Sequence, residues 1–259
     1  MPPARALLYA ATLGVLVFVA RAVLVEPPQL TLSIAVCVAY STLFMAGVFS
    51  IRLRMFADAV VSGPKDARGV VLTFDDGPHP VHTRKVLDVL DAAGVKATFF
   101  VIAKKAEALP ELVREIEERG HAVGLHSYAH DRLFSLRSSS RIKADLTRGI
   151  AALEKILGRR PALFRPPIGH TTPAIARVAD ELDLSIVGWS VRGIDGFAGA
   201  IPALVESRIR AGLRHGAIVL LHDAAERGER EPAGVKALPN ILQAIDALGL
   251  PIVPLDPWV

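Results

Sequence analysis

The sequence predicts an α/β domain built on a parallel sheet or barrel, preceded by a pair of membrane-spanning helices. Three observations predict this arrangement. Apolar residues gather in the first 55 positions, strand-like and helix-like segments alternate through the rest of the chain, and ionisable residues follow most of the strand-like segments. The chain therefore divides into a membrane part and a part that carries the chemistry.

The composition of the 259 residues excludes several classes of protein. Hydrophobic residues make up 51% and the mean hydropathy is +0.39, which excludes disorder and exceeds what a water-soluble enzyme needs. The net charge of +4 is concentrated before Gly69, so no basic stripe remains later in the chain and we expect no nucleic-acid partner. The only cysteine, Cys37, lies in an apolar run, which excludes a disulfide framework and a cysteine-based metal site.

Two apolar runs near the N-terminus are long enough to cross a bilayer. Residues 6–25 contain one charge, Arg21, and residues 30–51 contain none, whereas about 20 apolar residues span the hydrocarbon core. A cleaved signal peptide is the alternative for the first run. However, Arg5 is the only basic residue before it, and the second run would anchor the chain even if the first were removed. A buried helix pair of a soluble protein is disfavoured because residues 30–51 lack a polar face.

We therefore predict a two-span protein of the bacterial cytoplasmic membrane, with the lipid bilayer as one partner. Residues 1–55 form the hairpin, 56–68 a linker, and 69–259 the catalytic domain. Lys and Arg favour the cytoplasmic flanks of spans. Apart from Arg21, the basic residues of this region lie outside the two spans: Arg5 before the first, and Arg52, Arg54, Lys65 and Arg68 after the second. This distribution predicts that both ends of the hairpin are in the cytoplasm.

The later part of the chain alternates between two kinds of segment. Apolar or β-branched runs predict strands at 70–74, 97–102, 122–125, 162–164, 184–189, 217–221 and 251–253. Amphipathic stretches predict helices at 83–93, 110–119, 140–157, 172–182, 202–213 and 239–248. Strands that alternate with helices in this way are typical of parallel sheets and barrels, whose chemistry collects at the carboxyl ends of the strands.

Two strand ends carry residues typical of a catalytic metal site. Asp75 and Asp76 follow the first strand, and adjacent carboxylates are costly there unless positive charge pairs with them. His126 and His130 follow the third strand, at a spacing that favours metal ligands over unrelated polar residues. One carboxylate and two histidines leave coordination positions open for water and substrate. Later strand ends add Arg165, Asp195 and His222, whereas His79 and His82 are interpreted as surface residues.

These residues resemble the ordered motifs of the polysaccharide deacetylases, the NodB homology or carbohydrate esterase family 4 type. The resemblance covers about residues 69–255 and implies an irregular (β/α)7 barrel. Its motifs are Thr73-Phe74-Asp75-Asp76-Gly77-Pro78, His126-Ser127-Tyr128-Ala129-His130, Arg165-Pro166-Pro167 and Leu220-Leu221-His222.

The resemblance also implies a role for each residue. The metal ligands are Asp76, His126 and His130; zinc is expected, with cobalt, nickel and manganese as alternatives. Asp75 is the general base and Arg165 orients it. His222 is the general acid, kept protonated by Asp195, and the backbone N–H of Ile168 stabilises the oxyanion.

The implied function is a metal-dependent hydrolase that removes N-acetyl or other N-acyl groups from amino sugars of a polysaccharide or cell-wall glycan. Two positions depart from the family: Ile168 stands where an aromatic residue is usual, and Gly196 where tryptophan is frequent. A platform for a long sugar chain is therefore in question. The alternatives are a deacylase of a lipid-carrier-linked amino sugar at the cytoplasmic membrane face, an inactive membrane-tethered carbohydrate-binding protein and, from the barrel alone, a sugar isomerase.

Overall fold

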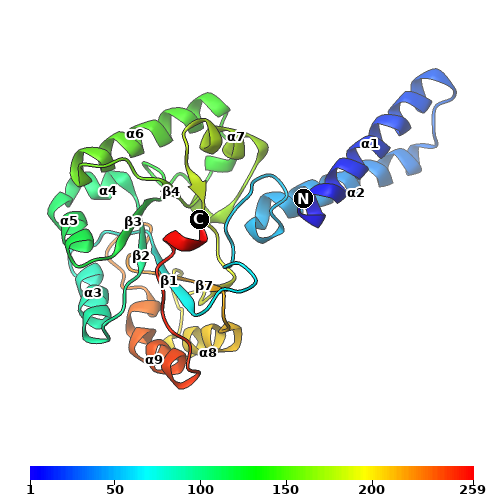
Figure 1. Cartoon of the computed structure of the whole chain (residues 1–259). Helices are drawn as coiled ribbons and strands as arrows, with labels where there is room; N and C mark the ends of the chain where they lie inside the picture. Colours follow the sequence, from blue (N-terminus) through cyan, green and yellow to red (C-terminus); the bar gives the residue numbers. More distant parts are fainter.

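The computed structural model describes all residues from 1 to 259 and shows a rounded α/β domain with a helical hairpin projecting from one side (Figure 1). Seven strands form one sheet in the order β5-β4-β3-β2-β1-β7-β6, and every pairing is parallel. The strands are β1 (Val70–Asp75), β2 (Thr98–Val101), β3 (Ala122–Leu125), β4 (Leu163–Phe164), β5 (Ser185–Ile186), β6 (Val191–Arg192) and β7 (Ala217–His222).

Helices surround the curled sheet on its outer side (Figure 1). They are α3 (His82–Ala92), α4 (Ala103–Ala108), α5 (Pro110–Glu118), α6 (Ser139–Leu157), α7 (Pro173–Glu181), α8 (Pro202–Gly212) and α9 (Ala233–Ala247), with short 3-10 turns at Ile51–Leu53, Phe134–Leu136, Pro167–Gly169 and Asp256–Trp258. The central strand β1 is buried along its whole length, as expected when helices and neighbouring strands cover a parallel sheet.

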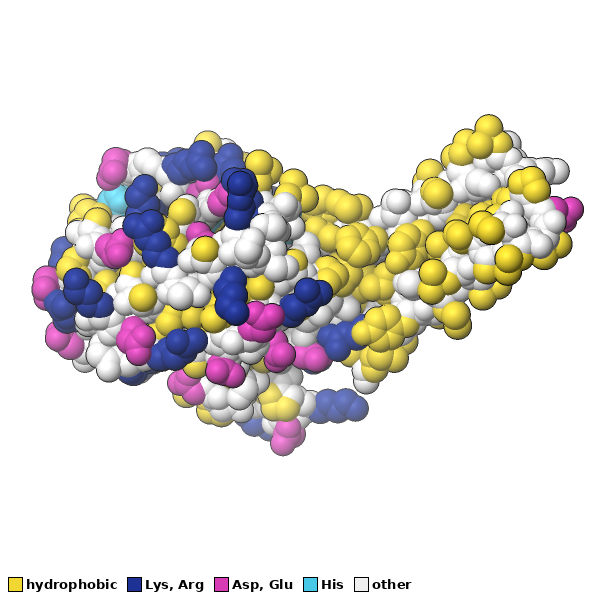
Figure 2. All heavy atoms as spheres, turned by 90° about the horizontal axis from the view of Figure 1, so that it is seen from above, with side chains coloured by type: hydrophobic (Ala, Val, Ile, Leu, Met, Phe, Trp, Pro, Cys, Tyr) yellow, Lys and Arg dark blue, Asp and Glu magenta, His cyan; other side chains and the backbone are white.

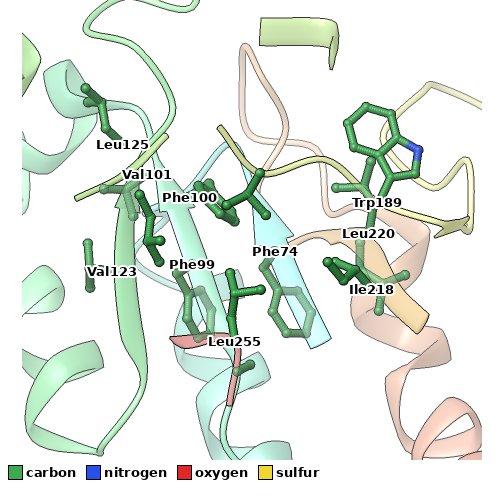
Figure 3. Close-up of a cluster of buried hydrophobic side chains, with 14 of the residues drawn as sticks. Phe74, Phe99, Phe100, Val101, Val123, Leu125, Trp189, Ile218, Leu220 and Leu255 are labelled. Carbon is green, nitrogen blue, oxygen red and sulfur yellow. The ribbon is translucent and has the colours of Figure 1, made fainter. Parts of the chain in front are cut away.

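The core forms because successive strand residues point to opposite faces of the sheet. Phe74 and Phe99 are register partners in β1 and β2, and their rings stack at a centroid distance of 5.1 Å (Figure 3). They belong to a continuous cluster of 52 buried hydrophobic residues. Thr73 and Asp75 alternate with Phe74 and so point to the other face, where Arg165 contacts both of them.

The sheet curls without closing, because no ladder joins the edge strands β5 and β6. Segment 56–62 lies along this side of the sheet, where Val60 forms a bridge with Val187 and Ser62 forms one with Ala217. The result is an irregular parallel half-barrel, which confirms the predicted fold class.

Individual elements differ from the sequence prediction, and helix α4 has no predicted counterpart. Residues 251–253 form no strand of the sheet; only Ile252 makes an isolated bridge, to Val70. The predicted strand over 184–189 is the two-residue β5, and β6 lies at the opposite edge. Helix α9 begins at Ala233, earlier than predicted, and contains Pro239 in its second turn. Pro239 has no N–H to donate to the carbonyl of Val235, so the helix lacks one backbone hydrogen bond at this point.

The hairpin consists of α1 (Pro3–Leu24) and α2 (Leu30–Phe49). Both helices are long and apolar enough to cross a membrane, and in their most apolar stretches only 6% and 11% of the residues are buried. A core helix of a soluble protein would bury one face, so that interpretation does not fit. Figure 2 shows the hydrophobic side chains along the hairpin and their continuation onto the adjoining side of the α/β domain.

Candidate active site

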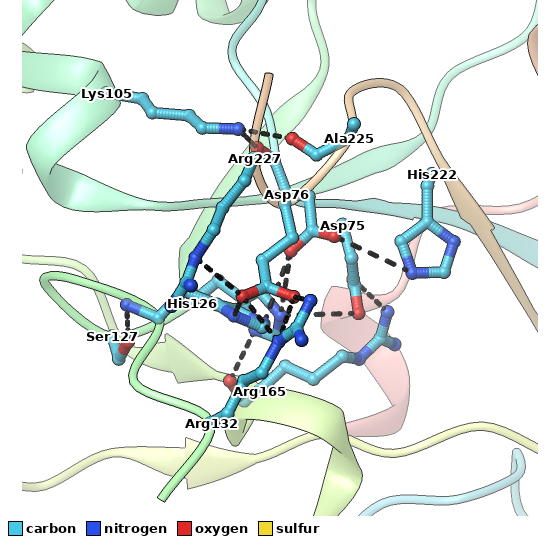
Figure 4. Close-up of polar contacts among 12 residues, drawn as sticks. Asp75, Asp76, Lys105, His126, Ser127, Arg132, Arg165, His222, Ala225 and Arg227 are labelled. Atoms are coloured by element: carbon cyan, nitrogen blue, oxygen red, sulfur yellow. Dashed lines mark hydrogen bonds and ion pairs between the residues drawn. The ribbon is translucent and has the colours of Figure 1, made fainter. Parts of the chain in front are cut away.

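The carboxyl ends of β1 and β3 bring together the three predicted metal ligands. Asp76 Oδ1 lies 3.4 Å from His130 Nε2 and 3.6 Å from His126 Nε2. One ligand atom from each side chain lies within 4.8 Å of the others, and all three residues are buried (Figure 4). This spacing suits a cation placed between the three atoms.

Polar atoms without partners at this site support the same interpretation. Asp76 Oδ1 is buried and has no hydrogen-bond partner in the protein, which is costly for a carboxylate oxygen unless a cation binds it. His126 Nδ1 lies 2.7 Å from the carbonyl oxygen of Arg165, which fixes the ring and directs Nε2 at Asp76. Burial lowers the pKa of His126 to about 4, so the ring is neutral at pH 7, as a metal ligand must be.

The backbone around the site is held in unusual conformations. Positive φ angles occur at non-glycine residues in the loops after β1, β3, β4 and β6: Asp76 (75°), Ser127 (62°), His130 (49°), Ile168 (60°) and Ile194 (57°). Such angles are uncommon for residues with a Cβ and are sustained only where the surroundings enforce them. The contacts around these loops therefore hold the backbone in conformations that place these side chains at the site.

Asp75 is held by a buried arginine. Arg165 Nη1 donates to Asp75 Oδ1 at 2.6 Å and to Thr73 Oγ1 at 2.8 Å. The remaining guanidinium donors bond the carbonyls of Val187 and Gly188, so the arginine is fixed as well as fully buried. The second oxygen, Asp75 Oδ2, remains near the ligand cluster, 3.8 Å from His126 Nε2.

His222 faces the cluster from β7 and is held by Asp195. Its Nδ1 lies 2.9 Å from Asp195 Oδ1, and its backbone N–H donates to Asp195 Oδ2. The free Nε2 lies 4.0 Å from Asp76 Oδ2 (Figure 4). Burial by itself lowers the pKa of His222, but the buried carboxylate of Asp195, helped by Asp75 and Asp76, outweighs burial and raises it to about 10.

These groups line a pocket of about 260 Å³ at the carboxyl ends of the strands. Ile168 contributes to its wall, and the backbone N–H of Ile168 donates to no acceptor in the protein. Trp189 is buried in the core and also lines the pocket. Its ring packs so closely on Gly169 that a Cβ there would lie 2.1 Å away, which explains the glycine.

Two residues near the site were missed in the sequence. Glu226 lines the pocket, pairs with Arg132 at 2.8 Å and lies 3.6 Å from His130 Nδ1. Lys105 donates to the carbonyls of Asp76 and Ala225 and so ties two site loops together. The available signal for Glu226 was its position four residues after His222, in the same loop.

The interpretation of His79 and His82 as surface residues is wrong. Both are buried, and their rings stack at 3.9 Å. His79 Nε2 lies 2.8 Å from Glu229, while neither ring lines the pocket. They brace the loop after β1 against the loop after β7.

Comparisons with known proteins agree with this geometry. The family model described as polysaccharide deacetylase matches residues 62–187. A peptidoglycan-N-acetylglucosamine deacetylase from Bacillus cereus is 31% identical over 194 residues, covering 75% of this chain and 69% of its own. A chitooligosaccharide deacetylase from Bradyrhizobium sp. is 35% identical over 216 residues, covering 80% and 95%.

A solved structure gives the same result. The crystal structure of the peptidoglycan N-acetylglucosamine deacetylase Bc1960 superposes with a TM-score of 0.71 at 31% identity, over 76% of this chain and 91% of that one. The predicted enzyme class, a hydrolase of the polysaccharide deacetylase type, is thereby confirmed. The chain belongs to the polysaccharide deacetylase family.

Proposed function

We propose that this chain is a membrane-anchored, metal-dependent hydrolase that removes the N-acetyl group of an amino sugar. The observation that carries the proposal is the convergence of three groups on one pocket: a buried Asp-His-His cluster, a carboxylate fixed by a buried arginine, and a histidine fixed by a buried carboxylate. Amide hydrolysis needs an electrophile, a base and an acid, and these three groups supply them.

Asp76, His126 and His130 would hold the metal, and two nitrogens and one carboxylate oxygen favour zinc, with cobalt, nickel or manganese as alternatives. When bound, the ion would polarise the amide carbonyl and lower the pKa of water at the site. Zinc sites of catalytic type have three protein ligands and an open position, and this cluster would supply three ligands.

Asp75 acts as the general base that accepts the proton of the attacking water. Arg165 occupies Asp75 Oδ1, so the proton goes to Oδ2, the oxygen near the ligand cluster. The arginine also fixes the rotamer of the carboxylate, since the arginine itself is buried and held by the carbonyls of Val187 and Gly188. Asp75 and Arg165 thus work as one unit.

His222 acts as the general acid on the opposite side of the pocket. Asp195 binds Nδ1, which leaves the proton on Nε2 free to pass to the departing amine. As the carbonyl oxygen gains negative charge, the unpaired N–H of Ile168 can donate to it. The products are the free amino sugar and acetate.

The pocket limits the size of the substrate group that it encloses. Its volume of about 260 Å³ lies just below the ~300–1,000 Å³ typical of sites that enclose a whole small ligand. One acetamido sugar unit is therefore enclosed, and the rest of the substrate lies outside. Ile168 and Gly196 provide no flat aromatic surface for neighbouring sugars.

The test is acetate release from N-acetylglucosamine oligomers by the full chain in detergent, before and after metal removal by a chelator. We expect release to stop on chelation and to return on addition of zinc. Oligomer binding with intact metal and no acetate release would favour the inactive carbohydrate-binding protein instead. Sugar isomerisation would appear as a rearranged sugar without acetate.

The hairpin favours a second candidate substrate, an amino sugar carried by a membrane lipid. Arg5, at the start of α1, donates to the carbonyl of Met55 and pairs with Asp58 at 2.9 Å, so the first helix is attached to the linker. Removal of residues 1–25 as a signal peptide would break these contacts. An intact hairpin keeps the active site beside the bilayer, where lipid-linked sugars are concentrated.

The side of the membrane decides between the two kinds of substrate. Both ends of the hairpin lie next to the linker, and the Lys and Arg bias of these flanks favours the cytoplasm. A periplasmic reporter and a cytoplasmic reporter, each fused after Val259, measure this directly. Signal only from the cytoplasmic fusion supports a lipid-linked precursor. Signal only from the periplasmic fusion favours exported or cell-wall glycan.

A further inference from the structure

Exposed hydrophobic side chains lie in the loops that form the active site, and Ile168, Ile194 and Phe197 among them line the pocket. They lie in three loops that follow β3, β4 and β6, all at the carboxyl edge of the sheet. The residues, here called the apolar rim, are Leu133, Leu136, Ile168, Ile194, Phe197 and Ile201, which are 43–76% exposed. Scattered exposed hydrophobic residues are ordinary on a protein surface, but a set carried by neighbouring loops of one site indicates contact with an apolar partner.

The apolar rim adjoins the hairpin through direct contacts. The backbone N–H of Thr171 donates to the carbonyl of Val48 at 3.1 Å, and the Thr171 hydroxyl donates to that of Gly47. The ring of His170 packs edge-on against Phe49 at 4.9 Å. The loop that carries Ile168 is thus fixed to the last turn of α2, where the chain leaves the predicted span.

The second rim loop is connected to the same point. Ser135 Oγ lies 3.4 Å from His170 Nδ1, and Ser135 stands between Leu133 and Leu136 in sequence. The last turn of α2, the loop after β4 and the loop after β3 therefore form a continuous surface that runs from the hairpin to the pocket. Figure 2 shows hydrophobic side chains continuing from the hairpin onto the neighbouring part of the domain.

The charge at the pocket mouth suits the same partner. Arg192 lines the pocket, is exposed, and forms no side-chain hydrogen bond or ion pair in the protein. An unpaired arginine among exposed aliphatic and aromatic residues is the composition typical of surfaces that lie in the headgroup region of a bilayer.

We propose that the apolar rim rests in the membrane interface, so that the active site opens onto the bilayer and receives an amino sugar whose anchor lies in that same membrane. This inference rests on the proposed deacetylase function and on the hairpin spanning the membrane. It explains why the position after Arg165-Pro166-Pro167 is the aliphatic Ile168: the side chain meets lipid rather than a sugar chain.

The position of the rim can be measured without reference to activity. The chain has one cysteine, so Cys37→Ala provides a background into which Leu136→Cys or Leu248→Cys is introduced and labelled with a fluorophore. Both leucines are exposed, but Leu248 follows α9 at the opposite end of the barrel, near the start of β1. The full chain is reconstituted in vesicles of phosphatidylethanolamine and phosphatidylglycerol that contain a lipid-borne quencher.

We expect strong quenching of the label at position 136 and little at position 248. Equal weak quenching at both positions would overturn the proposal. If the emission at position 136 changes with protein concentration and not with the quencher, a second copy of the chain covers the rim. That result would also overturn the proposal.

Activity in the same vesicles provides the second arm. Leu136→Ser with Ile201→Ser changes two rim residues that do not line the pocket, and Leu248→Ser is the matched control. With N-acetylglucosamine linked through phosphate to a polyprenol, kcat/KM should fall on the order of tenfold in the rim variant. With a soluble chito-oligosaccharide it should match the wild type.

The two substrates separate failure of this proposal from failure of the deacetylase assignment. Equal loss on both substrates would indicate that the rim binds a glycan chain, and would overturn the lipid contact. Acetate release from the soluble oligomer without preferential quenching at position 136 removes the rim proposal but leaves the deacetylase. No acetate from either substrate, with metal bound, removes the deacetylase itself.

Discussion

The α/β domain and the hairpin place the same kinds of side chain in opposite surroundings. In the domain, Phe74 and Phe99 are fully buried and stack on each other between sheet and helices. In the hairpin, Leu13 and Leu16 are 63% and 61% exposed. The domain contains its own hydrophobic core, whereas the hairpin has none, and both of its helices are long and apolar enough to cross a membrane.

This difference between the two regions extends to the candidate catalytic residues, all of which lie in the α/β domain. The domain carries a complete set of reactive groups, and the hairpin carries none. The loop after β4 belongs to both regions: it supplies Ile168 to the pocket, and Thr171 binds the last turn of α2. The last turn of α2 is therefore attached to the loop that forms one wall of the active site.

Changes to the reactive groups should have the largest effect and should act in the domain alone. Asp75→Asn removes the base but no ligand, so we expect it to keep the metal and lose about 10²–10⁴-fold in kcat. His130→Ala should lose metal and activity together. Metal analysis and acetate release from soluble oligomers measure both. Metal loss in the first variant with retention in the second would reverse the assigned roles.

Core truncation should separate the two regions by stability. Phe74→Ala removes a fully buried ring and should lower the free energy of unfolding of the domain by about 3–5 kcal/mol. Leu13→Ala changes an exposed position of α1 and should leave that quantity unchanged. Denaturant unfolding in detergent, followed by the fluorescence of Trp189 and Trp258, provides the measurement. Similar losses in both variants would mean that the hairpin is part of the domain core.

The pH dependence should report the His222–Asp195 pair. Because the folded pKa of His222 is raised to about 10, the ring is protonated at neutral pH, and its contribution to catalysis is lost as pH rises through that value. Asp195→Asn removes the main raising charge, so the alkaline limb of kcat/KM should move to lower pH. His222→Ala should remove that limb. An unchanged limb in both variants would assign the acid role to another group.

Removing the contact between the start of α1 and the linker should have the smallest effect on stability and activity. Arg5 pairs with Asp58, and the side chain of Asp58 is 69% exposed, so the ion pair is weak. Arg5→Ala should therefore lower the free energy of unfolding by less than about 1 kcal/mol and leave turnover of soluble substrates unchanged. Faster proteolysis in the linker would reveal the loss of attachment. Arg21→Ala, at the far end of the hairpin, is the matched control, because its partner Glu26 is also in the hairpin. Equal linker proteolysis in both variants would show that Arg5 does not hold the junction.

Much of the fold and of the candidate site was accessible from the sequence, because the relevant signals are local. Long apolar strands such as β1 and β7 have clear patterns, and each is followed directly by its site residues. In a parallel sheet the carboxyl ends share one edge, so Asp76 and His126 were expected to lie together. The structure places them there.

What the sequence did not reveal depends on non-local contacts. Strand β6 has two residues and is defined only by pairing with β7, so no periodicity marks it. Glu226 lies in a polar loop and reaches the site only through the path of that loop. The burial of His79 and His82 depends on the approach of Glu229 from a loop 150 residues later. Pairings at such separation leave no mark on a local pattern.

The central claim, one metal-dependent deacetylase site in the domain, is tested most directly by titration of zinc into the metal-free full chain with acetate release followed at each step. We expect activity toward N-acetylglucosamine oligomers to rise in proportion to bound zinc and to saturate at one ion per chain. The His126→Ala variant should neither bind the ion nor release acetate. Full acetate release by the metal-free chain, or activity that does not follow metal occupancy, would contradict it.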